Sequence, residues 1–184
     1  MCADRRSSGL RFLENLAYLV PGYEGYRDQA RRQEEDSRLR GRVNRKLLYL
    51  LNALESIHDR WSAEAWDTHM DLLDQRRIQL QTIVDTVKSP PPTYAMFFST
   101  TQLEEDLLER LLESDLLILQ DLDDTEAYLE SRGAKVTTAP RTVRAFLRTL
   151  DEHLGSLERH LIMREKILAS ATWNDMEANP SQAA

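Results

Sequence analysis

One stretch decides the fold class: residues 143–168, VRAFLRTLDEHLGSLERHLIMREKIL. Apolar residues recur through it at alternating spacings of four and three, the heptad pattern of a helix that buries one stripe against other helices. A long amphipathic helix is therefore predicted to begin at Pro140 and to continue to about Trp173. Its seam positions are Val143, Leu147, Leu150, Leu154, Leu157, Leu161, Arg164 and Leu168.

The same spacing occurs in three further segments, which run from Val43 to Trp61, from Trp66 to Val87 and from Leu108 to Leu129. A stiff Ser-Pro-Pro-Pro spacer at residues 89–92 separates the second from the third. Short or moderate connections between four long helices favour an up-down-up-down bundle. The sequence thus predicts an all-α fold, an elongated antiparallel four-helix bundle of coiled-coil-like character. The same repeat also permits two chains to share one bundle.

The N-terminal region differs from these four segments. Residues 10–20 are predicted to form a short amphipathic helix that ends at Pro21-Gly22. Residues 26–42 carry many charges and almost no apolar face, so we expect this segment to project from the bundle, supported by ion pairs four residues apart. The predicted division is residues 1–42 as an N-terminal arm, 43–172 as the bundle and 173–184 as a disordered tail.

Composition limits the class of protein. Charged residues make up 30% of the chain and aromatic residues 7%, which is typical of long helices rather than of a sheet. The single cysteine, Cys2, can form neither an intrachain disulfide nor a thiolate zinc site. Apolar runs fall short of the roughly 18 residues of a membrane span, and the N-terminus lacks signal-peptide features. We expect a cytoplasmic protein.

Charge is distributed unevenly along the chain. Residues 1–46 hold eleven Arg or Lys and seven Asp or Glu, whereas the rest holds thirteen and twenty-four. A basic arm suits an acidic partner, and the acidic remainder argues against binding of nucleic acid. Residues 104–130 hold eleven acidic residues and one arginine, and we expect this strip to dock a basic partner or the chain's own arm.

Three charged residues, Arg77, Asp115 and Arg164, occupy seam positions that are apolar elsewhere. In an antiparallel bundle Arg77 and Asp115 fall at similar heights, so we expect them to form a buried polar layer that fixes the register. Arg164 is expected nearer to Asp106 and Glu109. The alternative is that these side chains reach the edge of the bundle. No nucleophile or histidine shares these layers, so no catalytic residue is predicted.

Histidine spacing raises the question of a metal site. Glu55-x-x-His58 has the one-turn spacing of di-iron bundles, but a second Glu-x-x-His motif is missing. His153 and His160 lie two turns apart on one flank of their helix. These four residues define a metal-binding alternative, while the main prediction is that the protein uses no metal and no cofactor.

The first helix is the main functional lead. Together with the turn that follows, it supplies the predicted interaction residues, which are Phe12, Leu16, Leu19, Tyr23 and Tyr26. Such a helix can dock in the groove of a protein partner, lie on an anionic membrane surface or pack on its own bundle. The sequence leaves these three alternatives open.

Two patches carry a resemblance to other proteins. Residues 19–26, LVPGYEGY, run into an Arg- and Asp-rich helix, and residues 94–98, YAMFF, precede an acidic helix that contains LLESDLL at 111–117. In these patches the chain resembles a group of bacterial helical proteins that share a Pro-Gly-Tyr-x-Gly-Tyr turn and have no assigned reaction. The resemblance implies a bacterial, helical, non-secreted protein. It also implies that the turn at Tyr23 and Tyr26 matters, through packing or through contact.

These features favour a non-enzymatic interaction or scaffold protein that assembles with itself or with a protein partner, using the N-terminal arm and one face of the bundle. A peripheral adaptor on an anionic membrane surface and a metal-binding helical bundle are the two alternatives.

Overall fold

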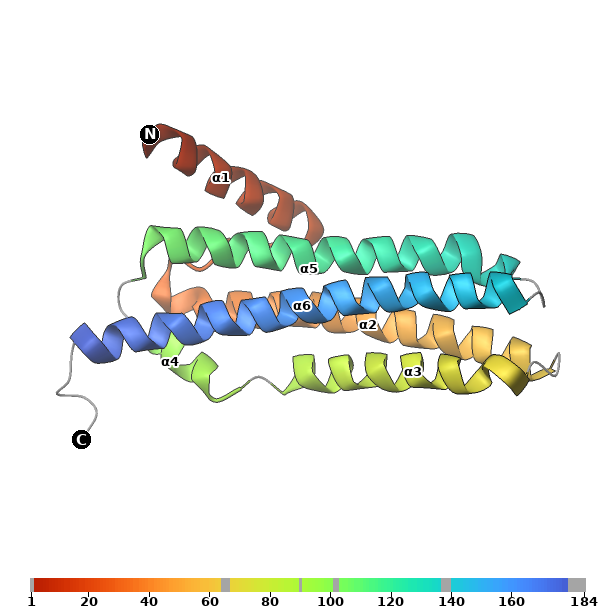
Figure 1. Ribbon diagram of the computed structural model, residues 1–184. Helices are drawn as coiled ribbons and strands as arrows, with labels where there is room; N and C mark the ends of the chain where they lie inside the picture. The colour runs from red at the N-terminus through yellow and green to blue at the C-terminus, as the bar shows by residue number, and fades with distance from the viewer. Residues whose placement is uncertain (1, 64–66, 90, 101–102, 137–139, 179–184) are drawn as a thin grey trace. The chain divides into compact units, whose positions relative to one another are not determined.

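The computed structural model describes residues 2–63, 67–89, 91–100, 103–136 and 140–178. Within these ranges the chain forms six α-helices and two short 3-10 helices, without a strand, so the all-α prediction is confirmed for them. The α-helices are α1 (Cys2–Leu19), α2 (Arg32–Ala63), α3 (Asp67–Lys88), α4 (Thr93–Ser99), α5 (Glu105–Arg132) and α6 (Pro140–Ala178), with η1 at Gln29–Arg31 and η2 at Gly133–Lys135 (Figure 1). Among the described residues, every helix is either too short or too polar to cross a lipid bilayer.

The chain divides into two compact units. Unit 1 contains Met1–Arg42, Pro90–Leu119 and His160–Ala184, and unit 2 contains Val43–Ser89 and Gln120–Arg159. Helices α2, α5 and α6 therefore each supply residues to both units. This division differs from the predicted one of 1–42, 43–172 and 173–184 in that residues 1–42 group with α4 and with parts of α5 and α6. Helix α6 continues through the first half of the predicted tail, to Ala178, and residues 179–184 lie outside the described part of the chain.

Unit 2 has an apolar core that follows the heptad pattern. Trp61 is fully buried and meets Phe146 edge to face at 6.0 Å, and Phe146 stacks on Tyr128 at 5.5 Å. Ion pairs flank this core, with Lys46 on Asp123 and Glu126 and with Arg76 on Asp151. The other buried seam residues of unit 2 are Val43, Leu47, Leu50, Leu54, Ile57, Leu73, Leu80, Val84, Val87, Leu122, Thr125, Leu129, Val143, Leu147, Leu150, Leu154 and Leu157.

The charged N-terminal part of α2 does not project into solvent, which corrects the expectation from its polar composition. Arg32, Glu35, Asp36 and Leu39 are all buried in unit 1. Helix α2 itself begins at Arg32, after the short η1 helix, whose N-cap Asp28 accepts a hydrogen bond on its carboxylate from the backbone N–H of Ala30. Polar side chains with polar partners can be buried as well as apolar ones, and hydrophobic periodicity does not report them.

Helix α1 and α2 are joined by the Pro-Gly-Tyr-Glu-Gly-Tyr turn. Gly22 and Gly25 both have positive φ, of 80° and 82°, a backbone conformation that side chains rarely adopt. The turn buries Tyr23 and Tyr26, and the carbonyl of Gly22 accepts a hydrogen bond from Arg38. The two glycines therefore allow the chain to reverse while both tyrosine rings enter unit 1.

We expect Gly25→Ala to lower the free energy of unfolding by about 1–3 kcal/mol, because a side chain at positive φ is strained. Its Cβ would also lie 3.1 Å from Cδ1 of Leu13. Gly41→Ala is the matched control, because Gly41 lies inside α2 with nothing within 4 Å of a Cβ. That variant should raise stability by about 0.5–1 kcal/mol. Urea unfolding measures the stability of both variants. If their unfolding midpoints move in the same direction, the turn does not require a glycine at position 25.

Candidate functional site

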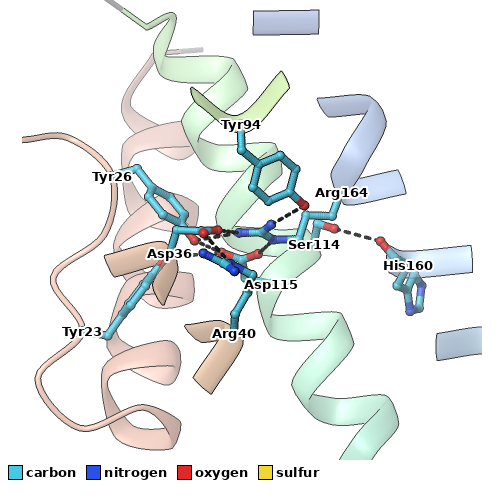
Figure 2. Close-up of polar contacts among 9 residues, drawn as sticks. All are labelled: Tyr23, Tyr26, Asp36, Arg40, Tyr94, Ser114, Asp115, His160 and Arg164. Carbon is cyan, nitrogen blue, oxygen red and sulfur yellow. Dashed lines mark hydrogen bonds and ion pairs between the residues drawn. The ribbon is translucent and has the colours of Figure 1, made fainter. Parts of the chain in front are cut away.

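A cluster of buried polar side chains lies inside unit 1 (Figure 2). It draws on five separate segments: the turn after α1, the start of α2, α4, the first half of α5 and the last part of α6. We call it the Arg164 cluster, and its members are Tyr23, Tyr26, Asp36, Arg40, Tyr94, Asp115 and Arg164.

The guanidinium of Arg164 is the centre of this cluster. Its Nε donates to Oδ1 of Asp115 at 2.6 Å, and its Nη2 donates to Oδ1 of Asp36 at 2.7 Å. The same Nη2 reaches the hydroxyl of Tyr26, and Nη1 donates to the hydroxyl of Tyr94, each at 3.0 Å. Only 4% of the Arg164 side chain is exposed. Burial lowers the pKa of Arg164, but the nearby Asp115 carboxylate and its other anionic neighbours outweigh it, so the pKa is raised well above its ordinary value.

Asp115 is the acceptor at which the turn and α6 meet. Its Oδ2 accepts from the hydroxyl of Tyr26 at 2.8 Å and from that of Tyr23 at 3.3 Å, while Oδ1 is bound by Arg164. Burial raises the pKa of Asp115, and the charge and hydrogen bonds of Arg164 act in the opposite direction. Burial is also the main reason why the pKa values of Tyr23 and Tyr26 are raised well above that of a free phenol.

Asp36 completes the charge balance. Its Oδ1 accepts from Arg164, and its Oδ2 accepts from Nε of Arg40 at 2.6 Å, one turn further along α2. Two arginines thus face two aspartates, and both oxygens of both carboxylates have donors. A buried ion pair is stable only when such extra hydrogen bonds satisfy its remaining polar atoms.

A second contact holds the start of α2 to α4. Nε of Arg32 donates to the carbonyl of Tyr26 at 2.8 Å, and Nη1 donates to the carbonyl of Thr100. The guanidinium also lies over the ring of Phe97, 5.8 Å from its centroid. Phe97 in turn meets Tyr26 edge to face at 5.7 Å. The turn, α2 and α4 therefore form one connected set of contacts within unit 1.

The chemistry of the Arg164 cluster is that of a structural joint. The carboxylates of Asp36 and Asp115 and the guanidinium of Arg164 are occupied by one another, by Arg40 and by three tyrosine hydroxyls, and these three charged groups are buried. A nucleophile or a general base needs a side chain that can approach a reacting group. In this cluster the hydrogen-bonding atoms instead tie five segments of the chain together.

The predicted Arg77–Asp115 layer is corrected by this geometry. Asp115 is fully buried, as a seam residue should be, but its partner is Arg164. Arg77 pairs with Asp74 on its own helix at 3.0 Å and leaves 34% of its side chain exposed. Arg164 binds both Asp115 and Asp36. Similar height along antiparallel helices does not fix this pairing, because polar groups of the turn and of α2 also bind Asp115 and Arg164.

The predicted interaction residues fall into two groups. Leu16, Tyr23 and Tyr26 are buried within unit 1, and Phe12 and Leu19 are partly buried. Of the three alternatives for the first helix, packing on its own protein therefore applies to its C-terminal part. Tyr18 has the opposite environment, with 87% of the residue exposed.

The metal candidates are not gathered into one site. Glu55 is exposed, and the Nε2 atom of His58 lies 3.4 Å from Oδ1 of Asp74. The ring of His153 rests against Tyr128 at 5.2 Å, and the carbonyl of His160 accepts from the hydroxyl of Ser114 at 3.4 Å. Among the described residues, no three or more His, Cys, Asp or Glu side chains form a group able to hold a metal ion.

Sequence reasoning missed Asp36, Arg40 and Tyr94 as members of the buried cluster. Asp36 and Arg40 belong to the charged segment that was expected to project from the bundle, and they do pair one turn apart, but Asp36 is buried and Arg40 is partly buried. A signal was present, since a charged residue at a seam position needs a partner of opposite charge.

Comparison of the chain with protein-family models, with curated proteins and with solved structures gives no match.

Proposed function

We propose that this chain is a non-enzymatic, cytoplasmic interaction or scaffold protein of bacterial origin, built as an elongated antiparallel four-helix bundle. It assembles with a protein partner or with itself through its N-terminal helix and one face of the bundle. One observation carries the proposal: large apolar side chains stay exposed on helices that are otherwise rich in charge. They are Tyr18, Leu48, Tyr49, Leu72, Ile78, Ile162 and Met163.

The N-terminal helix supports this proposal because its C-terminal end is packed firmly within unit 1. Leu16 and Val20 are buried in unit 1, and the turn behind them is held by the tyrosines of the Arg164 cluster. Tyr18 lies between these two anchors and is the most exposed large apolar residue in the described part of the chain. Tyrosine gives contact surfaces a large rigid ring at little entropic cost, and it is enriched at protein interfaces.

A protein partner fits this helix better than a membrane surface does. An interfacial helix inserts its apolar face among lipids, but Leu16 and Val20 of that face are already packed within unit 1. Glu14 and Asn15, which are exposed beside Tyr18, favour an aqueous contact. The closed Arg164 cluster fits a protein that keeps its segments in fixed positions, and it favours the interaction role over catalysis.

Photo-crosslinking in the cell that naturally produces the protein tests this proposal. A photoreactive amino acid is placed in the full-length chain at Tyr18, Ile78 or Ile162, with Glu113 and Gln120 as exposed control positions. We expect discrete adducts of defined mass from at least one of the three apolar positions and none from the controls. If all five positions give the same background, the interaction proposal is wrong.

A further inference from the structure

We infer that unit 1 opens while unit 2 stays folded, and that α2 and α6 each break at a glycine when it does. Both helices pass from one unit into the other, α2 after Arg42 and α6 after Arg159. Gly41 lies one residue before the first of these points, and Gly155 lies four residues before the second. Each break therefore falls where a helix leaves one unit for the other.

The surroundings of these two glycines do not require a glycine. A Cβ at Gly41 would meet nothing within 4 Å, and a Cβ at Gly155 would meet only the tip of the Arg159 side chain, 3.6 Å from Nη1. Both positions lie inside α-helix, without the positive φ of Gly22 and Gly25. A glycine in the interior of a helix destabilises it relative to alanine. Gly41 and Gly155 thus weaken α2 and α6 without any gain in packing.

Each glycine suits the helix end that forms in the open state. When unit 1 opens, the part of α2 that belongs to unit 2 begins just after Gly41, and glycine is accepted at the N-cap position. The part of α6 in unit 2 then ends near Gly155, and glycine is the usual residue just beyond the C-terminus of a helix. Ser156 follows directly, and Gly/Ser pairs are among the few sites at which helices kink.

Two polar atoms close to Gly41 also favour opening. The Nε atom of Arg42 and the Oδ1 atom of Asn44 are buried and have no hydrogen-bond partner. A buried polar atom of this kind has lost its hydrogen bond to water without gaining another. Exposure of this part of α2 returns both atoms to water and so favours the open state.

Helix α5 differs from the other two helices. It also passes between the units, after Leu119, but its sequence from Glu105 to Arg132 contains neither glycine nor proline. Leucine and glutamate, its main residues, are good helix formers. We therefore expect α5 to remain continuous while α2 and α6 break.

Opening has a consequence for binding, and this step rests on the proposed function. Leu16, Tyr23 and Tyr26 belong to the N-terminal helix and its turn, and all three are buried in the closed unit 1. The open state releases them from the Arg164 cluster and from the packing around it. A protein partner that binds them only in the open state shifts the equilibrium toward opening. Opening of unit 1 thus controls whether the whole N-terminal helix is available to a partner.

Native-state hydrogen exchange of the full-length protein tests the opening. In the wild type, the amides of residues 36–40 and 161–168 should share one opening equilibrium that leaves the unit 2 parts of α2 and α6 protected. Gly41→Ala and Gly155→Ala should each slow this exchange about two- to fivefold, the factor that separates glycine from alanine inside a helix. Asn52→Ala is the matched control, because Asn52 is exposed on α2 within unit 2 and stays helical in both states. It should leave the exchange of unit 1 unchanged.

The outcomes separate this inference from the proposed function. A step in protection at both glycines, slower exchange in both glycine variants and no change in Asn52→Ala support the opening. Equal protection on the two sides of each glycine overturns it, and so do glycine variants that exchange like the wild type or an Asn52→Ala variant that slows unit 1 as Gly41→Ala does. If crosslinks from Tyr18 then still reach another protein, the interaction function stands. If the step is present but no position gives crosslinks, the opening stands and the interaction function is wrong.

Discussion

Asp115→Ala is expected to lower the free energy of unfolding by about 3–5 kcal/mol, the largest effect of any single substitution considered for this protein. Removal of the carboxylate leaves the guanidinium of Arg164 buried with Asp36 as its remaining ion-pair partner. The hydroxyls of Tyr23 and Tyr26 also lose their acceptor, and a buried donor without a partner costs about 1–3 kcal/mol. Chemical unfolding followed by circular dichroism measures the change.

Two further variants show that the charge pair, rather than a loss of volume, causes this effect. Glu113→Ala on the same helix is the control, because Glu113 is exposed and a surface substitution changes stability by no more than about 0.5 kcal/mol. Asp115→Leu combined with Arg164→Met removes both members of this ion pair, so its loss of stability should be smaller than the sum of the two single losses, with Asp36 keeping Arg40 as its ion-pair partner. A double variant that is as unstable as the sum of its two single variants would show that the two side chains act independently.

The stability lost in Asp115→Ala should affect the turn after α1 as well as α5 and α6. Tyr23 and Tyr26 connect that turn to Asp115, and Asp36 connects α2 to Arg164. Hydrogen exchange of Asp115→Ala should therefore show faster exchange at the start of α2, while amides around Trp61 in unit 2 retain more protection. Equal loss of protection in both units would mean that the two units unfold as one.

The helical secondary structure and the apolar core could be predicted because both follow from the local periodicity of apolar residues. Leu50, Leu54 and Trp61 recur at heptad spacing and are buried. These predictions require only that an apolar stripe be buried somewhere. They do not require knowledge of which helix covers it.

The Arg164 cluster could not be predicted because the residues that bind one another in it are distant in sequence. Asp36 and Arg164 are separated by 128 positions, and Tyr26 and Asp115 by 89. Many arginines and acidic residues compete as partners for any one charge, and the choice depends on how the segments are arranged in three dimensions. The polar start of α2 was placed in solvent for the same reason, since no apolar pattern marks a helix that is buried through its hydrogen bonds.

The free energy of unfolding is expected to fall as the pH rises above about 10, because three tyrosines of the Arg164 cluster resist ionisation in the folded protein. The pKa values of Tyr23 and Tyr26 are raised well above the ordinary value, chiefly by burial and also by the Asp115 charge. Burial raises the pKa of Tyr94 as well, against the opposing effect of Arg164. The unfolded chain releases these protons near pH 10, while the folded chain retains them.

The sign of the effect follows from proton binding. Above pH 10 the folded state holds more protons than the unfolded state, so stability is complete below the unfolded pKa and is lost as the pH rises toward the folded values. Urea unfolding from pH 8 to 12, together with phenolate absorbance, measures it. Part of the absorbance of the six tyrosines should appear only as the helices unfold.

Tyr23→Phe is the informative variant for this pH dependence. It keeps the ring that packs against Tyr26 and removes a long hydrogen bond of 3.3 Å, so its stability near neutral pH should fall by about 1 kcal/mol or less. Its decline in stability at alkaline pH should be shallower than that of the wild type, because one proton fewer is retained on folding. If all six tyrosines ionise while the helices remain intact, the hydroxyls of Tyr23, Tyr26 and Tyr94 are open to solvent. The Arg164 cluster would then not be closed to water.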